Sequence, residues 1–169
     1  PTASVTAQPT CAVSTGTITI TSPIGGGYTY SVDGANYQSG TAFSGLATGT
    51  YNVMVKNSDG CISAATALTI NAQPLTPAAP TASVTAQPTC AVSTGTITVT
   101  APTGVGYTYS VDGTTYQAGT TFSGLTAGTY NVTVKNSDGC ISAATALTIN
   151  AQPLTPAQPL LGAVKQPTC

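Results

Sequence analysis

The sequence of 169 residues contains no histidine, arginine, glutamate or tryptophan, and only 4% of its residues are charged. The charges are three scattered lysines and four aspartates, and each aspartate is followed directly by a glycine. Three lysines cannot neutralise a phosphate backbone, which argues against nucleic acid as a partner. With aspartate confined to Asp-Gly turns, the chain lacks a general base and an activated nucleophile. We therefore expect no enzymatic activity and no cofactor.

Other kinds of site are excluded by what their motifs require. A zinc site is not expected, because there is no histidine and the cysteines lack a C-x2-C spacing. Calcium takes about six to eight oxygens, whereas each Asp-Gly turn offers one carboxylate. No apolar run approaches the roughly 18–20 residues of a membrane-spanning helix. Because the chain begins at Pro1, without a methionine or a signal peptide, we expect it to be an internal or processed fragment.

The residues that are abundant favour strands over helices. Threonine and valine are stiff at χ1 and fit a pleated sheet, while 18 glycines and 12 prolines interrupt regular structure frequently. The chain is 41% hydrophobic with a net charge of -1, which is not the composition of a disordered segment. These features predict an all-β protein with short strands.

An internal repeat determines the expected domain organisation. The segment PTASVTAQPTCAVSTGTIT begins at Pro1 and again at Pro80, which gives a period of 79 residues, and 67 of the 79 aligned positions are identical. This period exceeds the roughly 20–50 residues of a solenoid unit and is long enough for a domain with its own core. We predict domains over 1–79 and 80–158, the start of a third over 159–169, and proline-rich linkers over 71–80 and 150–159.

Alternation of apolar and polar residues predicts six strands in the first copy, over 4–7, 17–21, 28–32, 41–46, 51–56 and 62–70. Their inward positions form the predicted core, which comprises Ile18, Ile20, Tyr28, Tyr30, Phe43, Leu46, Tyr51, Val53, Val55, Leu68 and Ile70, and Ile62 is also predicted to point inward. Met54 is predicted to point outward, because the second copy has Thr133 there. The number and spacing of strands predict tandem immunoglobulin-like β-sandwiches, with Tyr51 as a tyrosine corner.

The order of short motifs along one copy resembles a known family. Cys11 is followed by GTITI, YTYS, GLATGTYNVMV, DGC, TALTI and QP. This series looks like the SprB-type immunoglobulin-like repeat of Bacteroidota surface adhesins and extracellular filaments. The resemblance covers nearly the whole unit, and it implies an extracellular domain of a long surface adhesin or filament exported by the type IX secretion system.

Five regularly spaced cysteines are the most informative candidates for a site. Cys11, Cys90 and Cys169 follow the first predicted strand of each copy, and Cys61 and Cys140 precede the last one. Their regular spacing suggests an oxidising compartment. No Cys-x-x-Cys pair or basic neighbour lowers a thiol pKa, so we expect structural disulfides and not redox catalysis.

The pairing of these cysteines has more than one solution. If the two cysteines of one copy lie at opposite ends of the sandwich, roughly 20 Å apart, they cannot be bridged, because the Cα atoms of a disulfide lie within about 7 Å. This geometry favours Cys11–Cys140 between copies, with Cys61 and Cys90 pairing to further repeats. The alternatives are Cys11–Cys61 with Cys90–Cys140 inside each copy, and Cys61–Cys90 between copies.

Two functions are compatible with this organisation. The first is a structural segment of a secreted or cell-surface fibre, whose partners are further copies of the repeat in the chain and identical chains in a filament. An uncharged surface has little long-range repulsion and favours such packing. The second is an adhesive module that binds a glycan or a surface through its loops. Tyr37 and Tyr116 are the loop residues that could contact such a ligand.

Overall fold

The structure is a computed structural model in which residues 1–158 are described. Within this range the chain forms strands, turns and loops and no helix, which confirms the all-β prediction. The described chain forms two compact units: the first comprises Pro1–Thr76 with Ser137–Cys140, and the second comprises Pro77–Asn136 with residues 141–158. The predicted start of a third repeat, with Cys169, lies outside the described residues.

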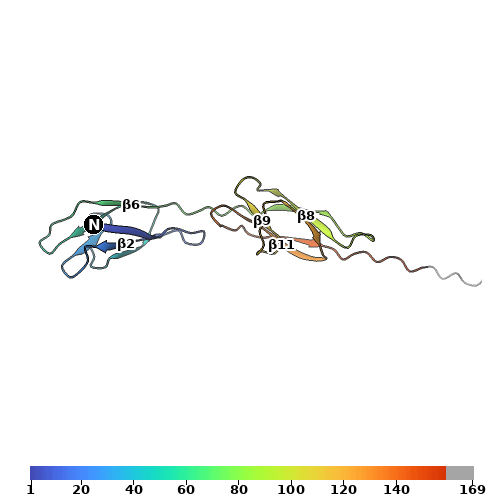
Figure 1. Ribbon diagram of the computed structural model, residues 1–169, viewed down its shortest axis with the longest axis horizontal. Helices are drawn as coiled ribbons and strands as arrows, with labels where there is room; N and C mark the ends of the chain where they lie inside the picture. The colour runs from blue at the N-terminus through green and yellow to red at the C-terminus, as the bar shows by residue number, and fades with distance from the viewer. Residues whose placement is uncertain (159–169) are drawn as a thin grey trace, which may run out of the picture. The chain divides into compact units, whose positions relative to one another are not determined.

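The first unit contains two antiparallel three-stranded sheets. One sheet has the order β1-β2-β4 and the other β3-β5-β6, so the chain crosses between the layers three times, after β2, after β3 and after β4. Figure 1 labels β2 and β6, which belong to different layers. The strands are β1 Thr2–Ala7, β2 Gly16–Ser22, β3 Thr29–Ser31, β4 Ala42–Leu46, β5 Gly49–Lys56 and β6 Thr66–Ile70.

Strand β2 shows why this sequence forms a two-layer structure. Gly16, Ile18 and Ile20 are buried, while the threonines between them are only partly buried, as expected where successive side chains point to opposite faces. Ile18 and Ile20 pack against Tyr30, Val53, Val55 and Ile70 from the other sheet. The core therefore lies between the sheets, which makes the unit a β-sandwich.

The remaining residues of the predicted core line the edges of this cluster. Tyr28, Phe43, Leu46, Tyr51 and Leu68 are partly buried and packed against the buried residues. Small domains have a high surface-to-volume ratio, so many core residues in such a unit keep one edge in solvent.

The second unit repeats the same order of elements. Its buried cluster contains Ile97, Val99, Tyr109, Val132, Val134 and Ile149, which are the counterparts of the first cluster one period along the chain. The sheets have the orders β10-β8-β7 and β12-β11-β9. The strands are β7 Thr81–Ala86, β8 Gly95–Ala101, β9 Thr108–Ser110, β10 Thr121–Leu125, β11 Gly128–Lys135 and β12 Thr145–Ile149.

The prediction for the segment before β6 is wrong. Instead of a continuous inward-facing strand from Ile62, the structure has an isolated bridge between Ile62 and Lys56, and Ile62 is 54% exposed. Ser63 takes the place next to β5, because its N–H donates to the carbonyl of Val55 at 2.9 Å and its hydroxyl accepts from the N–H of Val55 at 3.1 Å. This side chain–backbone pairing leaves Ile62 on the solvent side.

The outward position at Met54 is not open to solvent. The Tyr37 hydroxyl lies 3.9 Å from the sulfur of Met54, which is half-buried. In the second unit the Tyr116 hydroxyl lies 3.1 Å from the hydroxyl of Thr133, which is 8% exposed. A loop tyrosine therefore covers the outer face of β5 and of β11.

Candidate functional site: the cysteine linkage

The first local structure that carries a cysteine is the turn after β5. The amide oxygen of the Asn57 side chain accepts a hydrogen bond from the Cys61 N–H at 2.8 Å. Backbone bonds from Asn57 N–H to the Cys61 carbonyl and from Gly60 N–H to the Asn57 carbonyl close the turn at 3.1 and 3.0 Å. Gly60 has φ 84°, a left-handed conformation that favours glycine. Cys61 is thus held at the tip of a defined turn, where it is exposed.

The second local structure that carries a cysteine is the loop between β1 and β2. Thr10 and Val13 exchange two backbone hydrogen bonds of 2.8 and 3.3 Å, and the Thr10 hydroxyl also accepts from the Val13 N–H at 3.2 Å. These bonds close a compact loop around Cys11.

Two glutamines fix this loop to the end of the sandwich. The Gln8 side chain donates to the carbonyl of Thr69 at 3.1 Å and accepts from the N–H of Asn71 at 2.9 Å. The Gln73 side chain donates to the carbonyl of Cys11 at 3.1 Å. Sequence analysis did not single out these glutamines, although the Ala-Gln-Pro motif around each of them occurs twice in every repeat.

The glutamine contacts separate the two cysteines of one repeat. Cys11 lies beside the residues at the end of β6, whereas Cys61 precedes the start of the same strand. Residues 62–70 run between these two ends, and extended chain rises about 3.3 Å per residue. A disulfide between Cys11 and Cys61 would need Cα atoms within about 7 Å, which this arrangement does not provide.

The structure contains a disulfide between Cys11 and Cys140. Their Cα atoms lie 5.4 Å apart, and 129 residues separate them in the sequence. Cys140 is fully buried, and its segment Ser137–Cys140 belongs to the first unit. Cys61 and Cys90 are free and exposed, so the other pairings considered from the sequence are not formed. The bond joins a loop cysteine of one copy to a turn cysteine of the other.

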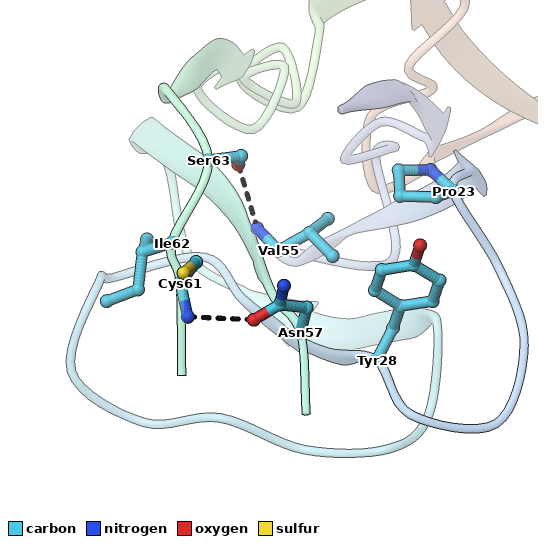
Figure 2. Close-up of a pocket in the computed structure, with 7 residues that line it drawn as sticks. All are labelled: Pro23, Tyr28, Val55, Asn57, Cys61, Ile62 and Ser63. Atoms are coloured by element: carbon cyan, nitrogen blue, oxygen red, sulfur yellow. Dashed lines mark hydrogen bonds between the residues drawn. The ribbon is translucent and has the colours of Figure 1, made fainter. Parts of the chain in front are cut away.

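A cavity of about 250 Å³ opens beside Cys61 (Figure 2). Pro23 and Tyr28 form one side of it, and Cys61 and Ile62 lie on the other. The rest of the lining consists of Val55, Asn57 and Ser63. The wall is mainly apolar, and the exposed cysteine stands at its edge.

The loop tyrosines proposed as ligand contacts are engaged within their own units. The Lys56 ammonium lies 4.4 Å from the centre of the Tyr37 ring, and the Lys135 ammonium lies 4.0 Å from that of Tyr116. Their hydroxyls contact the strand beneath, as described above. One ring face and the polar end of each tyrosine are therefore occupied, which reduces the surface that a sugar ring could use.

The Asp-Gly turns after β3 and β9 use their carboxylates for local hydrogen bonds. Asp33 accepts from the N–H groups of Ala35 and Asn36 at 2.9 and 2.8 Å, and from the Ser31 hydroxyl at 2.8 Å. These bonds stabilise the ionised form and hold the pKa of Asp33 well below its ordinary value. Backbone N–H groups that donate to the carboxylate lower the pKa of Asp112 in the same way. The carboxylates therefore stabilise turns.

Residues 1–158 offer neither a metal site nor a membrane-spanning helix. No group of three or more histidine, cysteine, aspartate or glutamate side chains is placed to hold a metal ion. The same residues include no helix with the length and hydropathy of a membrane span.

The chain is similar in structure to several solved β-sandwich proteins. The fibronectin(III)-like modules of Clostridium thermocellum CbhA share 15% identity over 89% of this chain and 95% of theirs, with a TM-score of 0.42. The FN1–FN3 domains of chicken CNTN1 share 15% sequence identity with it over 86% of this chain and 66% of theirs, with a TM-score of 0.42. Bacteroides ovatus SGBP-B, solved in complex with a mixed-linkage heptasaccharide, shares 14% sequence identity over 88% of this chain and 44% of its own chain, with a TM-score of 0.27. No protein-family profile and no curated protein matches the sequence.

Proposed function

We propose that the chain is a load-bearing structural segment of a secreted or cell-surface bacterial fibre, a stalk or filament whose successive repeats are joined by disulfides. The Cys11–Cys140 bond is the observation that carries this proposal. It connects residues of two copies of one repeat and leaves the intervening chain inside a covalent ring.

The ring changes how tension would pass along the chain. A pull on the two ends is transmitted from Cys11 through the sulfur atoms to Cys140, so residues 12–139 carry no load. All the buried residues of the first core, and all those of the second except Ile149, lie between Cys11 and Cys140 and therefore within this ring. Extension of the fibre therefore does not require the strands inside the ring to separate.

The surface and the loops support a passive role. Only 4% of the residues are charged, which allows repeats to pack closely without repulsion. Tyr37 and Tyr116, the aromatic residues that a glycan-binding function would use, instead cover the outer faces of β5 and β11. No contact in the described chain favours the binding module over the fibre.

Single-molecule pulling between residues 1 and 169 tests the proposal. Without reductant, only the residues outside the ring can extend. Adding reductant under load should release about 129 further residues, or roughly 450 Å of contour length at about 3.5 Å per residue. Cys140→Ser should behave as the reduced protein in either buffer, whereas Cys61→Ser, at the matching position, should behave as the parent. Full unfolding lengths from the oxidised parent would refute the proposal.

A further inference from the structure

The observed disulfide uses one loop cysteine and one turn cysteine, and one of each kind is left over. Cys90 lies in the loop that corresponds to that of Cys11, and Cys61 lies in the turn that corresponds to that of Cys140. Both unused thiols are exposed. The chain therefore presents the two halves of the same linkage.

The unused loop already has the conformation of the bonded one. Thr89 and Val92 exchange backbone hydrogen bonds of 2.8 and 3.3 Å, and the Val92 N–H reaches the Thr89 hydroxyl at 3.2 Å. The same bonds in the Cys11 loop have the same lengths. Gln152 donates to the Cys90 carbonyl at 3.1 Å, as Gln73 does to Cys11. Formation of the bond at Cys90 would need no rearrangement of its loop, which removes an ordering cost.

The unused turn is also formed in advance. The bonds between Ser63 and Val55 measure 2.9 and 3.1 Å, and those between Ser142 and Val134, beside the bonded Cys140, measure 2.8 and 3.0 Å. The two turns differ in the solvent exposure of their cysteines. Cys140 is fully buried, whereas Cys61 is exposed at the edge of an apolar cavity. Figure 2 shows this cavity with the turn that carries Cys61.

We propose that Cys61 and its cavity form a receptor for the Cys90 loop of a second copy of this chain, so that copies join head to tail through a Cys61–Cys90 disulfide. This inference rests on the proposed function, and it identifies the two surfaces that lengthen the fibre. The contact is heterologous, since it joins two different surfaces, and repetition of such a contact gives an open filament when it does not close into a ring.

Formation of the interchain Cys61–Cys90 bond is an oxidation, and it needs a small-molecule disulfide as the electron acceptor. One thiolate, from Cys61 or Cys90, attacks an oxidised small-molecule disulfide such as glutathione disulfide and releases one small thiol. The second protein thiolate then attacks the protein sulfur of the mixed disulfide, forms the interchain bond and releases the second small thiol. Two protein thiols lose two protons and two electrons, and one small disulfide becomes two small thiols.

The test uses two versions of the full chain, both with Cys169→Ser. One also carries Cys61→Ser and keeps only the loop thiol, and the other carries Cys90→Ser and keeps only the turn thiol. Equal amounts, tagged to differ in mass, are oxidised with glutathione disulfide and separated without reductant. Thiols that react only because they are exposed would give each homodimer at about half the amount of the heterodimer. We expect the heterodimer to exceed that ratio by at least about tenfold, a preference of about 1.4 kcal/mol.

The role of the cavity is tested separately from the thiols. Ile62→Lys, introduced into the version that keeps Cys61, places a charge at the cavity wall on a side chain that is 54% exposed. It should return the products to the statistical ratio. Ile24→Lys makes the same change at a residue that is 63% exposed and does not line the cavity, and the heterodimer preference should persist.

The outcomes separate this inference from the proposed function. A statistical ratio with the unmodified cavity would overturn the receptor, while the Cys11–Cys140 bond and the pulling result would stand. If Ile62→Lys left the preference intact, the cavity would have no part in the selection and the receptor would likewise be refuted. Loss of the Cys11–Cys140 bond, seen as two free thiols in an oxidised chain that carries Cys61→Ser, Cys90→Ser and Cys169→Ser, would instead refute the proposed function.

Discussion

The Cα atoms of Cys11 and Cys140 lie 5.4 Å apart although 129 residues separate them in the sequence. Neither cysteine bonds the other cysteine of its own repeat, because Gln8 and Gln73 hold the Cys11 loop at the far end of β6 from Cys61. The strand direction within one sandwich thus makes the covalent partner a residue of the neighbouring repeat.

The first prediction concerns stability. Replacing both Cys11 and Cys140 with serine should lower the free energy of unfolding by up to about 5 kcal/mol, since closing a ring of this size removes about that much chain entropy from the unfolded state. Guanidinium denaturation of the oxidised proteins measures the change. Cys61→Ser is the matched control and should leave the denaturation midpoint of the oxidised monomer unchanged, because Cys61 is exposed and takes no part in the ring. Equal midpoints for all three proteins would contradict the ring.

A second prediction follows from an asymmetry between the two cores. The Tyr109 hydroxyl donates to the carbonyl of Pro102 at 3.0 Å, whereas the hydroxyl of Tyr30, its counterpart, is buried without a hydrogen-bond partner among the described residues. Tyr109→Phe should therefore destabilise the protein by about 1 kcal/mol, and Tyr30→Phe should be neutral or stabilising, because an unsatisfied buried hydroxyl is unfavourable.

Thermal or chemical denaturation of these two phenylalanine variants provides the comparison. Burial also raises the pKa of the Tyr109 hydroxyl, which is consistent with its position in the core. A loss of stability for Tyr30→Phe equal to that for Tyr109→Phe would show that the two hydroxyls are in equivalent environments.

A third prediction concerns the contact between the sheets at Gly16. A Cβ atom on Gly16 would lie 2.7 Å from Cδ1 of Ile70 and 2.8 Å from the Ala7 carbonyl oxygen. Gly16→Ala should therefore destabilise the protein by about 1–3 kcal/mol, as overpacking in a core does. Gly26→Ala is the control, because no described atom lies within 4 Å of its Cβ position and its φ is not positive. Urea denaturation should show a lower midpoint for Gly16→Ala alone, and a result with both variants unchanged would refute the close contact.

Alternation in the sequence was sufficient to predict most of the sandwich. In β2 and β5 apolar residues recur at every second position, and the structure buries Ile18, Ile20, Val53 and Val55 at the predicted positions. The tyrosine corner is also confirmed, since the Tyr51 hydroxyl donates to the carbonyl of Ala47 at 2.9 Å. Local pattern and local turn chemistry both act over a few residues, so they can be recognised without the fold.

Features that depend on partners far along the chain could not be predicted in this way. Ile62 looks apolar and inward, but Ser63 forms the bonds to β5 that decide which side chain faces the core. Gln8 looks like an ordinary loop residue, and its partners lie 61 and 63 residues away. The cysteine pairing has the same character: the sequence limits the choices, but the choice among them depends on where each end of the sandwich lies.

The last prediction is a pH dependence that originates in the Asp-Gly turns. The pKa values of Asp33 and Asp112 lie below their ordinary value of 3.8, because backbone N–H groups donate to the ionised carboxylates. The unfolded chain binds these protons at a higher pH than the folded one. The stabilisation is therefore complete well above pH 3.8 and is lost as the pH falls through the pKa values of the folded state.

Urea midpoints measured from about pH 7 down to about pH 2 should decline at the acid end in the parent protein. Replacing Asp33 and Asp112 with asparagine should lower the midpoint at neutral pH and flatten this decline. The control replaces Asp59 and Asp138 with asparagine, which removes the same charge from the other two Asp-Gly turns and should preserve the decline. If the decline were equally steep after both pairs of substitutions, the hydrogen bonds to Asp33 and Asp112 would not be its source.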